Sequence, residues 1–178
     1  MLKSQKLKSS LFVRKGGELS LSGPALVELL RAVLDKGKPF RFRAKGSSMS
    51  PFVKDGDIIT VSPLTGDLPR LGEVVAYISA ETGRLIVHRV IGKRGECCLI
   101  RGDSAGEKQE WVAEAYILGR VTRVERNGKM VSLGLGPERR LIAFLSRRRL
   151  SWKLAHLFGR ILRALYDRRR GFARVNSP

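Results

Sequence analysis

Short apolar runs separated by turn residues fill the middle of the chain. The runs alternate with Gly, Pro and Asp and are rich in Val, Ile and aromatic residues, a pattern typical of strands. We predict strands at residues 40–45, 58–62, 74–79, 85–91, 97–101, 116–126 and 129–133. The Asn127-Gly128 pair favours a tight hairpin between the last two. Residues 38–134 are therefore predicted to form a mainly β domain, a sandwich or a partly open barrel.

Both flanks of this β domain have other patterns. Residues 1–18 are a basic lead-in without the apolar run of a secretion signal. Residues 19–37 predict an N-terminal helix that opens around Pro24, ends before Gly37 and packs one apolar face on the sheet. Residues 135–178 predict a basic, amphipathic helical tail, because apolar residues recur there at spacings of three and four with basic residues between them.

The charge of the chain favours anionic partners. It carries 35 Lys and Arg against 16 Asp and Glu, a formal net charge of +19. Residues 147–170 fit an anionic membrane surface, with Trp152 and Phe158 inserting and arginines meeting headgroups. Alternatively, this helix packs its apolar stripe on the β domain or on a partner protein. Nucleic acid is a less favoured partner, because no recognised binding motif accompanies the arginines.

The chain shows no run of the roughly 20 apolar residues that a membrane span requires. Together with the missing secretion signal, this predicts a cytoplasmic protein, peripheral on the inner face of the membrane if the tail binds lipid. No motif for a cofactor or a metal is found, and the adjacent Cys97 and Cys98 do not have metal-ligand spacing.

Candidate chemistry centres on Ser48 and His88. Ser48 lies in a segment of small residues that Pro51 ends, where a turn can present its hydroxyl. A serine nucleophile needs a nearby proton acceptor, and histidine is well suited to that role near pH 7. Of the two histidines, His88 lies in a predicted strand and His156 in the tail. The residues alone also allow an ordinary loop serine and a structural histidine.

A resemblance to a known family favours a catalytic role for Ser48 and His88. Residues 44–57, with Gly46-Ser47-Ser48-Met49 followed by Asp55-Gly56-Asp57, resemble the nucleophile box of type I signal peptidases and LexA-type self-cleaving repressors. Residues 71–77, 88–90, 101–104 and 115–121 resemble the later boxes in the family's order. The resemblance covers residues 40–126. It implies the coiled antiparallel β fold of that superfamily, with the substrate running as an extended strand beside the Ser48 loop.

The resemblance also implies roles for individual residues. His88 stands where one branch of the signal peptidases has a histidine base, so Ser48 and His88 would form a catalytic dyad. The Ser48 backbone N–H would face the developing oxyanion. Signal peptidases often have a hydroxyl residue at the position of Gly46, for which the neighbouring Ser47 is the candidate substitute. Met49 is expected to anchor the loop by packing.

A third group would orient the His88 imidazole. Asp103, in the family's acidic box, is the favoured candidate, and Glu107 is the nearest alternative. A Gly-Asp turn that closes a hairpin explains Asp103 equally well.

Three functions follow from these observations. The preferred one is a serine endopeptidase resembling signal peptidase I, without the usual transmembrane anchor, that cleaves a peptide or precursor. The second is a LexA-like self-cleaving or DNA-binding regulator, although the single helix before the β domain is too little for a helix-turn-helix domain. The third is a non-catalytic binding module with this fold.

Overall fold

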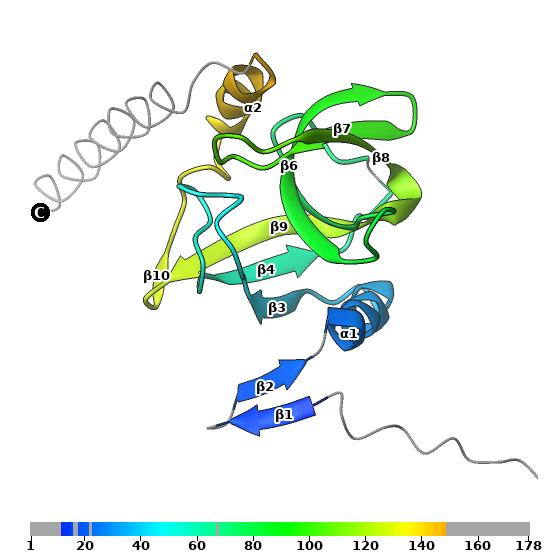
Figure 1. Ribbon diagram of the computed structural model, residues 1–178, viewed down its shortest axis with the longest axis vertical. Coiled ribbons are helices and arrows are strands. Elements are labelled where there is room, and N and C mark those ends of the chain that lie inside the picture. Colours follow the sequence, from blue (N-terminus) through cyan, green and yellow to red (C-terminus); the bar gives the residue numbers. More distant parts are fainter. Residues whose placement is uncertain (1–11, 16–17, 22, 67, 149–178) are drawn as a thin grey trace, which may run out of the picture.

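The computed structural model describes residues 12–15, 18–21, 23–66 and 68–148 (Figure 1). The fold is mainly β with an N-terminal and a C-terminal helix, as the sequence predicts. The elements are β1 (Phe12–Lys15), β2 (Glu18–Leu21), α1 (Gly23–Asp35), β3 (Phe40–Arg43), β4 (Ile58–Ser62), β5 (Val74–Ile78), β6 (Leu85–Arg94), β7 (Cys97–Arg101), β8 (Gln109–Ala113), the 3₁₀ turn η2 (Glu114–Tyr116), β9 (Ile117–Arg126), β10 (Lys129–Met130) and α2 (Arg139–Arg147).

One antiparallel sheet carries the fold, with the strand order β3-β4-β9-β5-β6-β7-β8 and β10 added beside β9. Figure 1 shows the sheet curling on itself. Its central strand β5 is buried on both faces, because alternate side chains of a strand point to opposite sides. Val74 and Ala76 enter one apolar cluster, and Val75 and Tyr77 enter the other.

Helix α1 covers the first of these clusters. Leu30 and Leu34 are buried on its inner side, where the helix contacts β3 and β9. The helix ends as predicted before Gly37, whose N–H donates to the Leu34 carbonyl over 2.8 Å, while the Lys38 N–H donates to the Val33 carbonyl over 3.2 Å. This is the hydrogen-bond pattern of a Schellman cap.

The sequence prediction was wrong at the N-terminal boundary and in one strand. β1 and β2 pair antiparallel, where residues 1–18 were expected to be a basic lead-in and the helical segment was given as residues 19–37. The helix itself begins at Gly23, which agrees with the predicted opening around Pro24. The Gly-Gly pair at residues 16 and 17, followed by the alternating run Glu18–Leu21, was the overlooked hairpin signal in the sequence. Strand β8 was missed because it is short and begins with the polar pair Gln109-Glu110. It lies at the sheet edge and buries only Val112.

The start of the predicted tail forms α2, which packs on β6. Ala143 is fully buried there with Ile91 and Leu99, and the Ser146 carbonyl accepts a 2.6 Å hydrogen bond from Arg101 Nη1. Residues 149–178 lie outside the described part of the chain, so membrane contact by residues 147–170 stays a prediction. None of the helices in the described ranges is long and apolar enough to cross a membrane.

The loop between β3 and β4 is closed at its base by two aspartates. The Gly46 N–H donates to Asp55 Oδ1 over 2.8 Å. The buried Asp57 carboxylate accepts hydrogen bonds from Arg126 Nε and Nη2, over 2.8 and 2.7 Å, and from the Lys54 N–H over 2.8 Å. The Asp-Gly-Asp sequence therefore fixes the two ends of the loop that carries Ser48.

The acid stability of the domain tests this closure. Burial alone raises the pKa of Asp57, but hydrogen bonds from Arg126 and Lys54 and their positive charges outweigh burial and hold the pKa below its ordinary value of 3.8. Because the folded state has the lower pKa, this contribution to the free energy of unfolding is complete above about pH 3.8 and is lost as the pH falls below it. Urea unfolding should show Asp57→Asn to be less stable than the wild type at neutral pH, with a smaller further loss on acidification. The exposed Asp35→Asn is the control and should follow the wild-type curve.

Candidate active site

Ser48 and His88 lie within hydrogen-bond distance although forty residues separate them in sequence. His88 Nε2 is 3.1 Å from Ser48 Oγ. Ser48 lies in a turn after β3, and His88 lies in β6. The turn is held by the Ser50 N–H, which donates to the Ser47 carbonyl over 2.9 Å, and by the Val53 N–H, which donates to the Met49 carbonyl over 3.0 Å. This is the geometry of a nucleophile beside its base.

The other predicted residues of the Ser48 loop support the turn in different ways. Gly46 has φ of +91°, a conformation that favours glycine, and it carries no hydroxyl for an oxyanion. Ser47 presents its carbonyl to the hydroxyl of Ser104. Met49 is buried in the main apolar cluster and anchors the turn, as expected. The Ser48 N–H has no acceptor among the described residues, which leaves it available to an oxyanion.

The loop after β7 holds the turn that carries Ser48 from the other side. The Ser104 N–H donates to the Ser48 carbonyl over 2.8 Å. Gly102 makes this approach possible, because a Cβ at this position would lie 2.6 Å from the Ser48 carbonyl oxygen and 3.1 Å from His88 Nε2. Any side chain at residue 102 would therefore push against both members of the pair.

Asp103 does not bind His88, so the expectation that it orients the imidazole is corrected by the geometry. Its Oδ1 and Oδ2 accept from Arg89 Nε and Nη2 over 2.8 and 2.6 Å, and both side chains are almost fully buried. Arg89 Nη1 also donates to the carbonyls of Gly72 and Gly134, each over 2.8 Å. This bidentate pair is strong and specific in its geometry, and it directs both carboxylate oxygens of Asp103 toward Arg89.

The second nitrogen of His88 faces a tyrosine. His88 Nδ1 is 3.3 Å from the hydroxyl of Tyr77, and that hydroxyl donates to Glu110 Oε1. The alternative candidate Glu107 lies near enough to affect His88 electrostatically, but Tyr77 is the group within hydrogen-bond distance of Nδ1. Sequence reasoning missed Tyr77 and Glu110. Pairing the predicted strands 74–79 and 85–91 by register would have placed Tyr77 on the face of His88.

The environment of His88 keeps its imidazole neutral. Burial lowers the pKa of His88 below 6.5, and the negative charges of Glu107, Glu110 and Asp103 offset only part of this effect. A neutral imidazole at pH 7 has one unprotonated nitrogen with which to accept a proton.

A family model described as Peptidase S24-like matches residues 17–122, which include Ser48, His88 and Asp103. The chain belongs to the Peptidase S24-like family. This family covers both serine peptidases and LexA-like self-cleaving regulators, so the predicted superfamily is confirmed. The narrower likeness to the histidine branch of type I signal peptidases stays a prediction. A search of curated proteins found no match.

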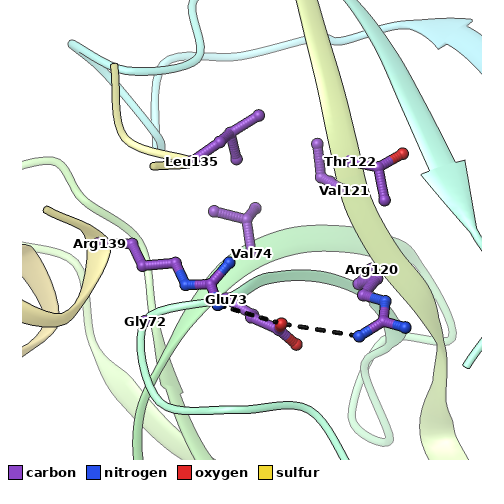
Figure 2. Close-up of a pocket in the computed structure, with 8 residues that line it drawn as sticks. All are labelled: Gly72, Glu73, Val74, Arg120, Val121, Thr122, Leu135 and Arg139. Atoms are coloured by element: carbon purple, nitrogen blue, oxygen red, sulfur yellow. Dashed lines mark ion pairs between the residues drawn. The ribbon is translucent and has the colours of Figure 1, made fainter. Parts of the chain in front are cut away.

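The S24-like domain also has a cavity of about 250 Å³ whose lining does not include the Ser48–His88 pair. Figure 2 shows Glu73 between Arg120 and Arg139, each 3.7 Å from its carboxylate. The cavity lies among the start of β5, β9 and α2, so it is not the place where Ser48 would meet a substrate. In the described ranges, no group of His, Cys, Asp and Glu side chains is arranged to hold a metal ion.

We expect Asp103 to contribute to the stability of the S24-like domain chiefly by pairing with Arg89. Asp103→Ala leaves a buried guanidinium without its counter-charge, which typically costs about 3–5 kcal/mol of the free energy of unfolding. Urea unfolding measures the loss. Arg41→Ala, which removes an exposed ion pair with Glu125, is the control and should cost less than about 1 kcal/mol. An Asp103→Ala protein as stable as the wild type would contradict the structural role.

Gly102→Ala should displace the turn that carries Ser48. The added methyl group meets the Ser48 carbonyl, so we expect a destabilisation of about 1–3 kcal/mol, typical of overpacking. Reaction of Ser48 with a fluorophosphonate should slow at least ~10-fold, because small misplacements of reacting groups are costly. Gly23→Ala, whose Cβ would meet nothing within 4 Å, is the control. Wild-type labelling of Gly102→Ala would show that the close approach is unimportant.

Proposed function

We propose that this protein is a serine endopeptidase in which Ser48 is the nucleophile and His88 is the general base. The observation that carries the proposal is the 3.1 Å separation of Ser48 Oγ and His88 Nε2. Membership of a family that includes serine peptidases supports it. The neutral state of His88 at pH 7 supports the role of base.

The reaction follows from these positions. As Ser48 Oγ attacks a peptide carbonyl, His88 Nε2 takes the hydroxyl proton, and the Ser48 N–H stabilises the oxyanion. The C–N bond breaks when the imidazolium returns the proton to the leaving amine. Water then attacks the acyl carbon while His88 accepts a proton from it. The bond between that carbon and Ser48 Oγ breaks as the imidazolium returns the proton to Oγ, which releases the acid and restores the serine hydroxyl.

The substrate class is a peptide or precursor bound in an extended conformation. Such a chain would lie beside the Ser48 turn as an added strand, with main-chain hydrogen bonds giving affinity and small pockets giving specificity. The partly exposed Ser48 supports access from outside the domain. The resemblance to signal peptidases with a histidine base favours small residues before the cut.

Self-cleavage is the second candidate, because the family includes LexA-like regulators. When a molecule cuts itself, the half-life of the intact chain does not depend on protein concentration. When one molecule cuts another, the half-life becomes shorter as the concentration rises. Incubation of the purified chain over a range of concentrations, followed by mass spectrometry, separates the two. A chain that stays intact at every concentration argues against self-cleavage.

Active-serine labelling tests the proposal directly. The wild type should react with a fluorophosphonate at Ser48 and cleave members of an extended-peptide library. Ser48→Ala should abolish both activities, and His88→Ala should slow them at least ~100-fold, in the range of general-base contributions. Ser132→Ala changes an exposed serine and should react like the wild type. If the wild type neither reacts nor cleaves, the enzyme proposal fails and a binding module is favoured.

A further inference from the structure

Three strands bring Tyr77, His88 and Glu110 together on one face of the sheet. His88 lies opposite Val75, so Tyr77, two residues along β5, is its diagonal neighbour. Glu110 lies opposite Ile100, which in turn lies opposite Val90, two residues after His88. Alternate residues of a strand share a face, and the hydroxyl of Tyr77 on β5 contacts the carboxylate of Glu110 on β8.

The contacts among the three side chains have only one consistent set of protons. A glutamate carboxylate at neutral pH only accepts hydrogen bonds, so the Tyr77 hydroxyl donates its proton to Glu110. The tyrosine oxygen then faces His88 with a lone pair, and Nδ1 must carry the hydrogen of that 3.3 Å contact. A neutral imidazole with its proton on Nδ1 has an unprotonated Nε2, which is the nitrogen facing Ser48 Oγ.

We propose that Tyr77 and Glu110 are positioning residues that hold His88 in the tautomer needed to accept the Ser48 proton. This inference rests on the proposed function. It assigns to a tyrosine and a glutamate the place that sequence analysis gave to Asp103 or Glu107. No proton needs to leave Tyr77, because the phenol acts only as a fixed acceptor for Nδ1–H and a donor to Glu110.

The burial of the pair suits this role. Tyr77 is fully buried. Burial, with the hydrogen bond and charge of Glu110, raises the pKa of Tyr77 above its ordinary value, so the phenol stays protonated through neutral pH. When His88 takes the serine proton, the resulting imidazolium is stabilised by the Nδ1–H contact and, beyond it, by the negative charge of Glu110.

The other charged groups near His88 set the expected pH response. These are Glu107 and Glu110, together with Asp103, which Arg89 neutralises. Since the charge of Glu110 raises the pKa of His88, Glu110→Gln should lower that pKa further. The acid limb of the plot of kcat/KM against pH should then move to lower pH while the plateau falls.

Kinetics on Tyr77→Phe, Glu110→Gln and the double variant test the inference. Each single variant should lower kcat at least ~10-fold with little change in KM, but less than the ~10⁴-fold loss seen when a directly bonded carboxylate is disabled. Because part of the effect of Glu110 acts through Tyr77, the losses in the double variant should be less than additive. Tyr116→Phe, an exposed tyrosine, is the matched control and should match the wild type.

Nitrogen NMR of His88 gives a readout that does not require activity. In the wild type at neutral pH the proton should lie on Nδ1, and in Tyr77→Phe it should redistribute toward Nε2. The spectrum of His88→Gln assigns the signals against those of His156. Wild-type signals in Tyr77→Phe, or an unchanged pH profile with additive losses in the double variant, would overturn the positioning role. A wild type that neither reacts with a fluorophosphonate nor cleaves peptides, but still carries its His88 proton on Nδ1, would refute the proposed peptidase and not the positioning of His88 by Tyr77 and Glu110.

Discussion

The buried ion pair between Arg89 and Asp103 is the interaction on which the candidate site depends. Arg89 is fully buried and uses Nε and both terminal nitrogens for hydrogen bonds to Asp103 and to the carbonyls of Gly72 and Gly134. Four segments distant in sequence therefore meet at one guanidinium. Such a pair adds little net stability relative to apolar residues, but its geometry is specific, and removing one partner is costly.

This pair sets the position of Ser48 through the backbone. With Asp103 fixed, the next residue, Ser104, donates from its N–H and its hydroxyl to the carbonyls of Ser48 and Ser47. At the base of the loop between β3 and β4, Asp55 accepts a hydrogen bond from the Gly46 N–H, and Asp57 accepts one from the Lys54 N–H. The direction of the Ser48 main chain is thus determined at both sides before its hydroxyl meets His88. Two consecutive residues of β6 have different partners. His88 contacts the hydroxyl of Ser48, and Arg89 binds Asp103 in the loop after β7.

Sequence reasoning predicted the parts of this arrangement that depend on local signals. Ile58–Ser62 and Cys97–Arg101 match strands β4 and β7 residue for residue, because each is an apolar run bounded by turn residues. The approach of Ser48 to His88 was implied by the resemblance of the residues around them to the boxes of the superfamily, in the same order. The partner of Asp103 was not implied, because a Gly-Asp turn beside a His-Arg pair allows the carboxylate to reach either side chain. Burial decided between them, since an unpaired guanidinium inside the core costs far more than an imidazole without a carboxylate.

The same competition explains why His88 has an indirect link to a carboxylate. Asp103 turns both oxygens toward Arg89, and the group at hydrogen-bond distance from His88 Nδ1 is the hydroxyl of Tyr77. A tyrosine on the neighbouring strand has the length to reach that nitrogen, but a lone phenol can rotate its hydrogen toward or away from the imidazole. Glu110 removes that freedom by taking the phenol hydrogen. Glu110 belongs to the polar pair that opens the edge strand β8 and made this strand hard to recognise. The same residue supplies the acceptor that completes the chain of hydrogen bonds from Ser48.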